Sequence, residues 1–230
     1  MRKLFIIAAL SLAAASLNSC GFLSSMATSI ATTPSFTCNG DGSDDCIYDG
    51  QSFQLAKLGT CNYSWSVSDP KQLLLSVSGN DATVTGNLTN HAVSASSKIT
   101  ARNADDATIE PVEKTIYIRA WEIKVYDAAG NLVSDPTKLT RSNNYILKMV
   151  RIGGTSGNPV YTPVTKLYKN MKISQTESLH SLAFTVSNST FSKVGQSDLT
   201  YTFSTPSKAA SCTFTAKLGS VSKKISVSTK

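Results

Sequence analysis

The chain has 230 residues, of which 41% are hydrophobic, and its formal net charge at pH 7 is +7. This length is enough for one large domain or two small ones. No cluster of Lys and Arg with interleaved aromatic residues occurs, which argues against a nucleic-acid partner. Beyond the first twenty residues, no apolar run is long enough to span a membrane.

The first 19 residues have the layout of a targeting segment. Arg2 and Lys3 precede an apolar stretch that is short for a membrane span, and the segment ends in Leu17-Asn18-Ser19-Cys20-Gly21. This ending resembles the lipobox of bacterial lipoproteins, in which the cysteine thiol takes a diacylglyceryl group and the peptide is cut before it. The resemblance implies a signal peptide at 1–19, a bilayer anchor at Cys20 and, by analogy, the outer membrane, facing the periplasm or the cell surface. The alternative is ordinary secretory cleavage after the alanines at 13–15, which leaves Cys20 a plain thiol.

Residues 20–35 follow the anchor and are small, hydroxyl-rich and almost uncharged. Such a composition cannot build a hydrophobic core. We therefore expect a lipidated flexible tether between the bilayer and the folded protein.

Period-two alternation of apolar and polar residues dominates from residue 35 onward and predicts strands with one buried face. The predicted strands lie at 61–67, 121–126, 182–186, 199–203, 212–218 and, with Lys223 inside the apolar series, 221–227. Turn-forming stretches separate them at 79–81, 127–131, 153–158 and 219–220. Many short strands with frequent turns predict an all-β protein built from antiparallel sandwiches.

Residues 49–119 contain Gly50-Gln51-Ser52-Phe53-Gln54-Leu55 and Trp65-Ser66-Val67-Ser68-Asp69-Pro70, followed by the strand-like stretches 82–86, 99–101 and 115–118. This series resembles a bacterial immunoglobulin-like domain of the group 2 type, found in intimins and other surface proteins. The resemblance implies that Trp65 is a core anchor on a middle strand. Such modules serve as spacers, adhesion units or binding platforms, and the fold alone does not choose among these roles.

The stretch from Lys114 to Asp127 looks like the last strand of one sandwich passing directly into the first strand of another. We expect two tandem immunoglobulin-like sandwiches, at 36–120 and 121–230. Residues 20–120 contain six Lys and Arg and ten Asp and Glu, so this part is acidic. Residues 121–230 contain 14 Lys and Arg and five Asp and Glu, so this part is basic. The basic half is suited to an anionic envelope or surface polymer, and the alternative is a solvated surface that keeps the protein soluble.

Four cysteines remain besides Cys20, and an even number in an exported protein favours disulfides. Cys38 and Cys46 bracket a turn-rich stretch and form the preferred pair. Cys61 and Cys212 lie in the apolar series of different predicted strands. They should point into separate cores, too far apart to be bridged, so the alternatives are a buried free thiol or pairing of one of them with the Cys38/Cys46 segment.

Catalytic motifs are absent from the sequence: His91 and His180 stand in no metal-binding spacing, and no nucleophile or phosphate-loop motif occurs. The one pattern with metal-binding character is Asn39, Asp41, Ser43 and Asp45, whose alternating oxygens could ligate calcium, although the EF-hand positions do not fit. A solvated acidic turn is the alternative, and no other cofactor is expected. The sequence therefore predicts a non-catalytic lipoprotein for envelope or surface adhesion or protein interaction. The alternatives are a glycan- or calcium-binding lipoprotein and a hydrolase that uses His180.

Overall fold

The computed structural model describes residues 33–89, 93–155, 157–171 and 178–230. These residues form seventeen β-strands and one short 3-10 helix, η1 (Pro136–Lys138), with no α-helix among them. The all-β prediction is confirmed. The predicted signal peptide, Cys20 and the tether up to residue 32 lie outside the described residues.

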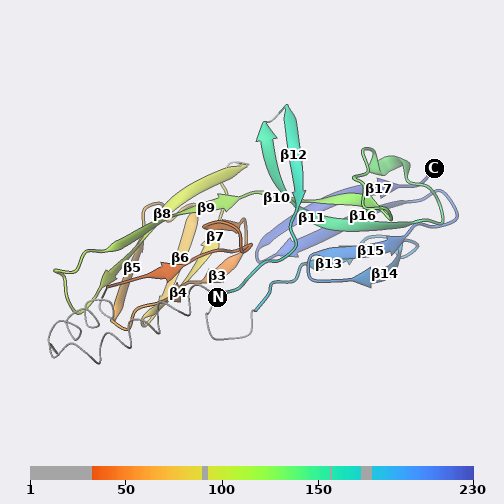
Figure 1. Ribbon diagram of the computed structural model, residues 1–230. Coiled ribbons are helices and arrows are strands. Elements are labelled where there is room, and N and C mark those ends of the chain that lie inside the picture. The colour runs from red at the N-terminus through yellow and green to blue at the C-terminus, as the bar shows by residue number, and fades with distance from the viewer. Residues whose placement is uncertain (1–32, 90–92, 156, 172–177) are drawn as a thin grey trace, which may run out of the picture.

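Two sheets form the N-terminal part of the fold (Figure 1). The larger has the order β2-β9-β8-β5, with bounds Cys46–Tyr48, Val112–Arg119, Ser94–Asn103 and Tyr63–Val67. The smaller has the order β3-β7-β6, with bounds Ser52–Gln54, Asp81–Gly86 and Leu73–Ser78. A two-stranded ribbon pairs β1 (Phe36–Thr37) with β4 (Ala56–Lys57). In immunoglobulin terms β3, β7 and β6 are strands B, E and D, and β5, β8 and β9 are C, F and G.

Trp65 anchors the core between these N-terminal sheets. It lies on β5, the strand C position, where Tyr63 and Trp65 are buried and the intervening Ser64 is exposed. The indole packs edge-on against Phe36 at a centroid distance of 5.3 Å, and its Nε1–H donates to the Asn80 carbonyl at 2.9 Å. A partner for the N–H allows this large side chain to be buried without an unsatisfied polar group.

Two further sheets form the C-terminal part. One has the order β10-β11-β15-β14, with bounds Trp121–Asp127, Asn144–Thr155, Thr200–Ser204 and Ser192–Gln196. The other has the order β13-β16-β17, with bounds Ala183–Val186, Ser211–Leu218 and Val221–Ser228. These orders correspond to A-B-E-D and C-F-G, the arrangement of an immunoglobulin sandwich. The predicted immunoglobulin-like sandwich class is therefore confirmed by strand order in both parts of the chain.

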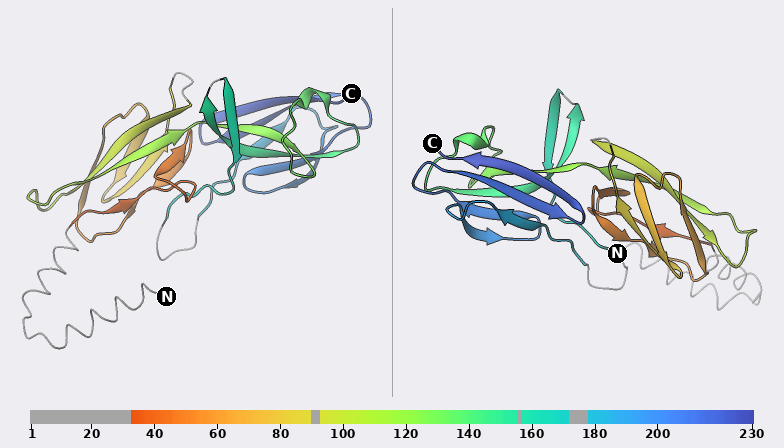
Figure 2. Two further views of the ribbon diagram at one scale, coloured as in Figure 1. Left: turned by 45° about the horizontal axis from the view of Figure 1, so that its top comes forward. Right: turned by 180° about the vertical axis from the view of Figure 1, so that it is seen from behind.

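One hairpin is additional to this sandwich. β12 (Asn158–Pro163) pairs with the distal part of β11, from Val150 to Thr155. The stretch 153–158, predicted to be a turn between strands, is therefore the tip of a β11–β12 hairpin. The hairpin stands away from the sheets in Figure 1 and in the right-hand view of Figure 2.

The N-terminal and C-terminal sheets lie end to end and exchange contacts across their junction (Figure 2). Tyr48 of β2 is 1% exposed and packs in the core of the C-terminal sheets. Tyr168, which follows β12, packs in the core of the N-terminal sheets, and its N–H donates to the Gly40 carbonyl at 2.8 Å. The chain thus crosses back over the expected boundary near residue 120, and the bounds 36–120 and 121–230 stay a prediction.

Gly50 and Gly219 mark a close backbone approach at this junction. Both have a positive φ, of +81° and +57°. A Cβ at Gly50 would overlap the Leu218 carbonyl oxygen, and a Cβ at Gly219 would overlap that of Gly50. Only glycine combines this backbone conformation with so little space.

Candidate functional site

A cleft of about 180 Å³ opens at the junction, between the loop before β2 and the strands β11 and β12. We call it the junction cleft. The side chains that give it chemical character are Asp41, Ser43, Tyr48, Arg151, Thr162, Thr165 and Lys166. Residues separated by more than 100 positions in the sequence therefore share one small, polar cleft.

Asp41 forms the anionic wall of the junction cleft. Its Oδ1 accepts hydrogen bonds from the Ser43 N–H at 3.0 Å and the Ser43 hydroxyl at 2.7 Å, and its Oδ2 accepts from the Tyr48 hydroxyl at 3.0 Å. Burial opposes ionisation of the carboxyl group, but these bonds outweigh it and lower the pKa of Asp41. Burial, reinforced by the Asp41 charge, raises the pKa of Tyr48, whose hydroxyl therefore stays protonated and keeps donating.

Arg151 forms the cationic wall. It lies on β11 and continues the inward-facing series Tyr145, Leu147 and Met149, all of which are buried. Its side chain is half-buried and makes no hydrogen bond or ion pair with any residue in the described ranges. A cation at the end of a core-facing series breaks the alternation that builds the strand, and such local violations concentrate at functional sites.

The four residues of the predicted calcium pattern do not point to a common centre. With its amide correctly oriented, Asn39 donates to Asp45 Oδ1 at 2.7 Å, whereas Asp41 is bonded to Ser43 and Tyr48. Within the described ranges, no three side chains of His, Cys, Asp or Glu are grouped as a metal site requires. Calcium binding at this loop stays a prediction, and Asp41 belongs to the junction cleft.

The preferred Cys38–Cys46 disulfide is not formed. Cys38, Cys46, Cys61 and Cys212 are all buried free thiols. Cys38 faces the N-terminal core, but Cys46 precedes Ile47 of that core on β2 and so faces the other side, toward Asp41 and Arg119. Cys61 and Cys212 lie in different cores, as their strand patterns predicted. Burial raises the pKa of Cys46 to about 12, and the Cys212 thiol donates to the Asn188 carbonyl at 3.9 Å.

His180, the histidine of the hydrolase hypothesis, is half-buried at the junction. Its Nε2 lies 2.7 Å from the Ser52 carbonyl oxygen, so the Nε2–H donates to this backbone group. Burial lowers the pKa of His180 and keeps the ring neutral. This hydrogen bond ties the segment before β13 to β3. His91 lies outside the described residues.

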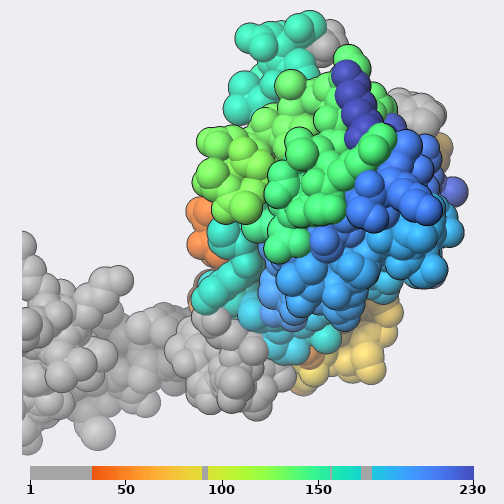
Figure 3. Space-filling view, turned by 90° about the vertical axis from the view of Figure 1, so that its right-hand side faces the viewer, coloured from red at the N-terminus to blue at the C-terminus, as the bar shows by residue number. Residues whose placement is uncertain are grey.

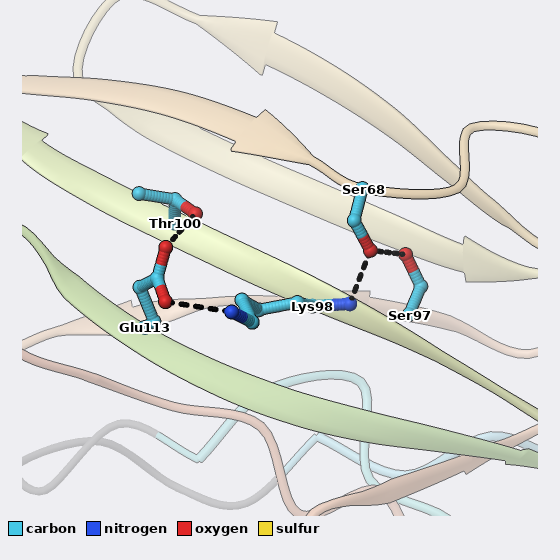
Figure 4. Close-up of polar contacts among 5 residues, drawn as sticks. All are labelled: Ser68, Ser97, Lys98, Thr100 and Glu113. Carbon is cyan, nitrogen blue, oxygen red and sulfur yellow. Dashed lines mark hydrogen bonds and ion pairs between the residues drawn. The ribbon is translucent and has the colours of Figure 1, made fainter.

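A polar ladder on β8 and β9 is the other prominent set of side-chain contacts (Figure 4). Glu113 accepts from the Lys98 ammonium at 2.8 Å and from the Thr100 hydroxyl at 3.3 Å. The hydrogen bond from Lys98 lowers the pKa of Glu113. The ion pair is solvent-exposed on both sides, so it stabilises the sheet only weakly. These side chains are exposed on the surface of the sheet, and we take the junction cleft as the candidate site.

No protein-family model matches the chain, and no curated protein matches it. Among solved structures, it is similar to domains 4–9 of the surface layer protein SbsC, with 18% identity over 86% of this chain and 31% of that one and a TM-score of 0.25. For an endo-fucoidan hydrolase of glycoside hydrolase family 107 the values are 14% identity, 80% of this chain, 32% of that one and a TM-score of 0.31. For the D00–D0 domain of intimin the identity is 10% over 85% of this chain and 100% of that one, with a TM-score of 0.29.

The chain spans about a third of the first two of these structures. All three TM-scores are too low to support an argument from similarity, so the immunoglobulin-like assignment rests on the strand order. No helix within the described residues combines the length and the apolar character needed to cross a bilayer.

Proposed function

We propose that the protein is a non-catalytic lipoprotein, anchored in the bacterial outer membrane through acylated Cys20, whose two immunoglobulin-like sandwiches act in adhesion or protein interaction at the cell envelope. The lipobox-like Leu17–Cys20 sequence and the featureless residues 21–35 support the anchor and the tether. The immunoglobulin-like strand order and the interlocked junction support a stiff module held away from the bilayer. In this arrangement the basic part of the chain lies farther from the anchor.

The β11–β12 hairpin is the observation that carries the proposal. It is an addition to the sandwich and stands clear of it in the space-filling view (Figure 3). Near its tip the Val160 side chain is 55% exposed, and Val93, which lines a hollow together with Gly153 and Tyr161, is 58% exposed. A projecting element with exposed apolar side chains contributes little to the core, and such surfaces are typical of contact sites.

Two prolines determine how a partner engages this hairpin. β12 pairs with β11 along one edge only, and Pro159, Tyr161 and Pro163 share the register positions that face the other edge. Proline has no N–H to offer, so only Tyr161 can donate a backbone hydrogen bond outward. The free edge is thereby protected against pairing with another strand. We therefore expect a partner to contact the side chains of the hairpin rather than extend its sheet.

Site-specific photo-cross-linking in intact cells tests the hairpin contact. A photoreactive residue at position 160 should give one discrete adduct, whereas the same residue at position 194 should give none. Val194 on β14 is the matched control, because it is also an exposed valine, at 56%. The adduct should persist in a chain that also contains Val194→Asp. An identical adduct from both positions, or none from position 160, would contradict the proposal.

A further inference from the structure

The junction cleft contains an acidic and a basic side chain that do not form an ion pair with each other. Asp41 and Arg151 both line the cleft, yet no ion pair joins them. Asp41 is instead fixed by Ser43 and Tyr48, so its carboxylate is oriented before any ligand arrives. The side chain of Arg151 has no anionic partner in the described part of the chain.

Arg151 is suited to a planar anion. A guanidinium group offers five N–H donors in a fixed fork that matches a carboxylate in a bidentate pair, and such pairs are among the stronger hydrogen bonds in proteins. Partial removal from water strengthens this attraction, since Arg151 lies at the end of a core and beside buried Tyr48. An anionic ligand would supply the partner that the fold leaves out.

Asp41 is suited to hydroxyl groups. An ionised carboxylate has about four acceptor positions, and three are used by Ser43 and Tyr48. The Cys46 thiol also hydrogen-bonds to Asp41, but a thiol is a weak donor, so a ligand hydroxyl that lies against the opposite wall can replace it. A simple anion would use Arg151 but leave Asp41 without a role.

The size and opening of the cleft restrict the ligand further. A volume of 180 Å³ corresponds to about six water molecules, which suits one sugar ring with its substituents. Thr162, Thr165 and Lys166 on the rim are exposed, so the cleft is open to solvent. A ring bound there could therefore remain part of a longer polymer.

We infer that the junction cleft binds one carboxylated sugar unit, with the carboxylate paired to Arg151 and a ring hydroxyl donating to Asp41. The site goes beyond the proposed hairpin contact, because its ligand would contact Arg151 at the base of the hairpin and Asp41 in the loop before β2, rather than the exposed Val160 near the tip. The test of the cleft ligand can therefore fail while the test of the hairpin contact succeeds, and the reverse. Since the cleft takes side chains from both parts of the chain, binding also requires the interlocked junction.

Calorimetric titration of the full chain in detergent with glucuronate tests this inference. Glucose, which lacks the carboxylate, and acetate, which lacks the ring hydroxyls, are the control probes. We expect millimolar binding of glucuronate and at least about tenfold weaker binding of glucose and of acetate. Arg151→Gln should weaken glucuronate binding at least about tenfold, and Arg151→Lys should weaken it less. Arg141→Gln is the matched control, because Arg141 is exposed and outside the cleft.

Asp41→Asn should weaken glucuronate binding but not the weak binding of acetate, which should stay equal or become tighter because a negative charge is removed from the cleft, and thermal melting of each variant verifies its fold. If this variant unfolds, Ser43→Ala replaces it, with a smaller loss in the same direction. Equal affinity of wild type and Arg151→Gln for glucuronate would overturn the inference. Acetate binding as tight as glucuronate, or tighter binding of glucose 6-sulfate, would overturn the assignment of a carboxylated sugar. The cross-link from position 160 should be unchanged in Arg151→Gln, which separates this test from that of the proposed function.

Discussion

Replacing Gln51 by Glu should make the stability of the junction depend on pH. Gln51 is fully buried and connects three backbone groups. Its Oε1 accepts from the Tyr48 N–H at 2.8 Å, and its Nε2 donates to the carbonyls of Gly40 at 2.9 Å and Tyr168 at 3.0 Å. In Gln51→Glu the donating nitrogen becomes an oxygen that faces two carbonyl oxygens. The substituted carboxyl group therefore lacks any favourable contact in its ionised form except the Tyr48 N–H.

The sign of the effect follows from the preferred protonation state. Burial and the two carbonyls favour the protonated acid, so the pKa of residue 51 in the folded Gln51→Glu variant lies above its unfolded value of about 4.3. The variant is least destabilised below this unfolded pKa, and the penalty grows by about 1.4 kcal/mol per pH unit as pH rises toward the folded pKa. With a rise of about three pH units, within the range documented for buried acids, the added penalty at pH 7 is about 4 kcal/mol. One lost donor adds about 1 kcal/mol at every pH.

Urea unfolding of wild type and variant at pH 4 and pH 7 measures this difference directly. Gln196→Glu serves as the control, because Gln196 is exposed on β14 and the substitution makes the same change in charge. The Gln51→Glu variant should lose several kcal/mol more at pH 7 than at pH 4, whereas the control should lose little at either. Equal losses of the Gln51→Glu variant at the two pH values would refute the argument that a buried donor at this position holds the junction together.

Three further predictions concern the packing of the same fold. Gly50→Ala should lower the free energy of unfolding by about 1–3 kcal/mol more than Gly79→Ala, because both have a positive φ but only Gly50 is crowded by a neighbouring carbonyl; equal melting temperatures would contradict this. Trp65→Ala should cost about 3–5 kcal/mol in urea unfolding because it empties the N-terminal core, and a loss below about 1 kcal/mol would show that the indole is not the anchor. His180→Ala should remove a hydrogen bond worth about 1 kcal/mol near neutral pH. Since the folded pKa of His180 lies below the unfolded value of about 6.5, this stabilisation should shrink as pH falls below 6.5, and a loss that grows on acidification would contradict the assignment.

Periodicity predicted the parts of the fold that depend on one buried face. The alternation around Trp65, Trp121 and Phe214 corresponds to β5, β10 and β16, because a half-buried strand must place apolar residues at every second position. Lys223 interrupts such a series on β17. It is accommodated there because its ammonium lies 5.9 Å from the Trp121 ring at the end of the sheet.

The contacts across the junction could not be predicted in the same way. Cys46, Ile47 and Tyr48 of β2 are all buried, so they show no alternation, and Tyr48 completes a core that belongs to distant strands. The disulfide prediction was wrong because a cysteine count contains no information about which way each thiol faces. One signal for the cleft was present: Arg151 stands where the series Tyr145, Leu147 and Met149 calls for another apolar residue.

Metabolic labelling with a fatty acid, followed by isolation of the chain and sequencing of its N-terminus, tests the lipid anchor at Cys20. Wild type should be labelled, begin at a blocked Cys20 and sediment with the outer membrane. Cys20→Ala should be unlabelled and uncleaved at this position. An unlabelled wild-type chain, soluble and beginning shortly after the alanines at 13–15, would contradict the lipid anchor and the display role that depends on it.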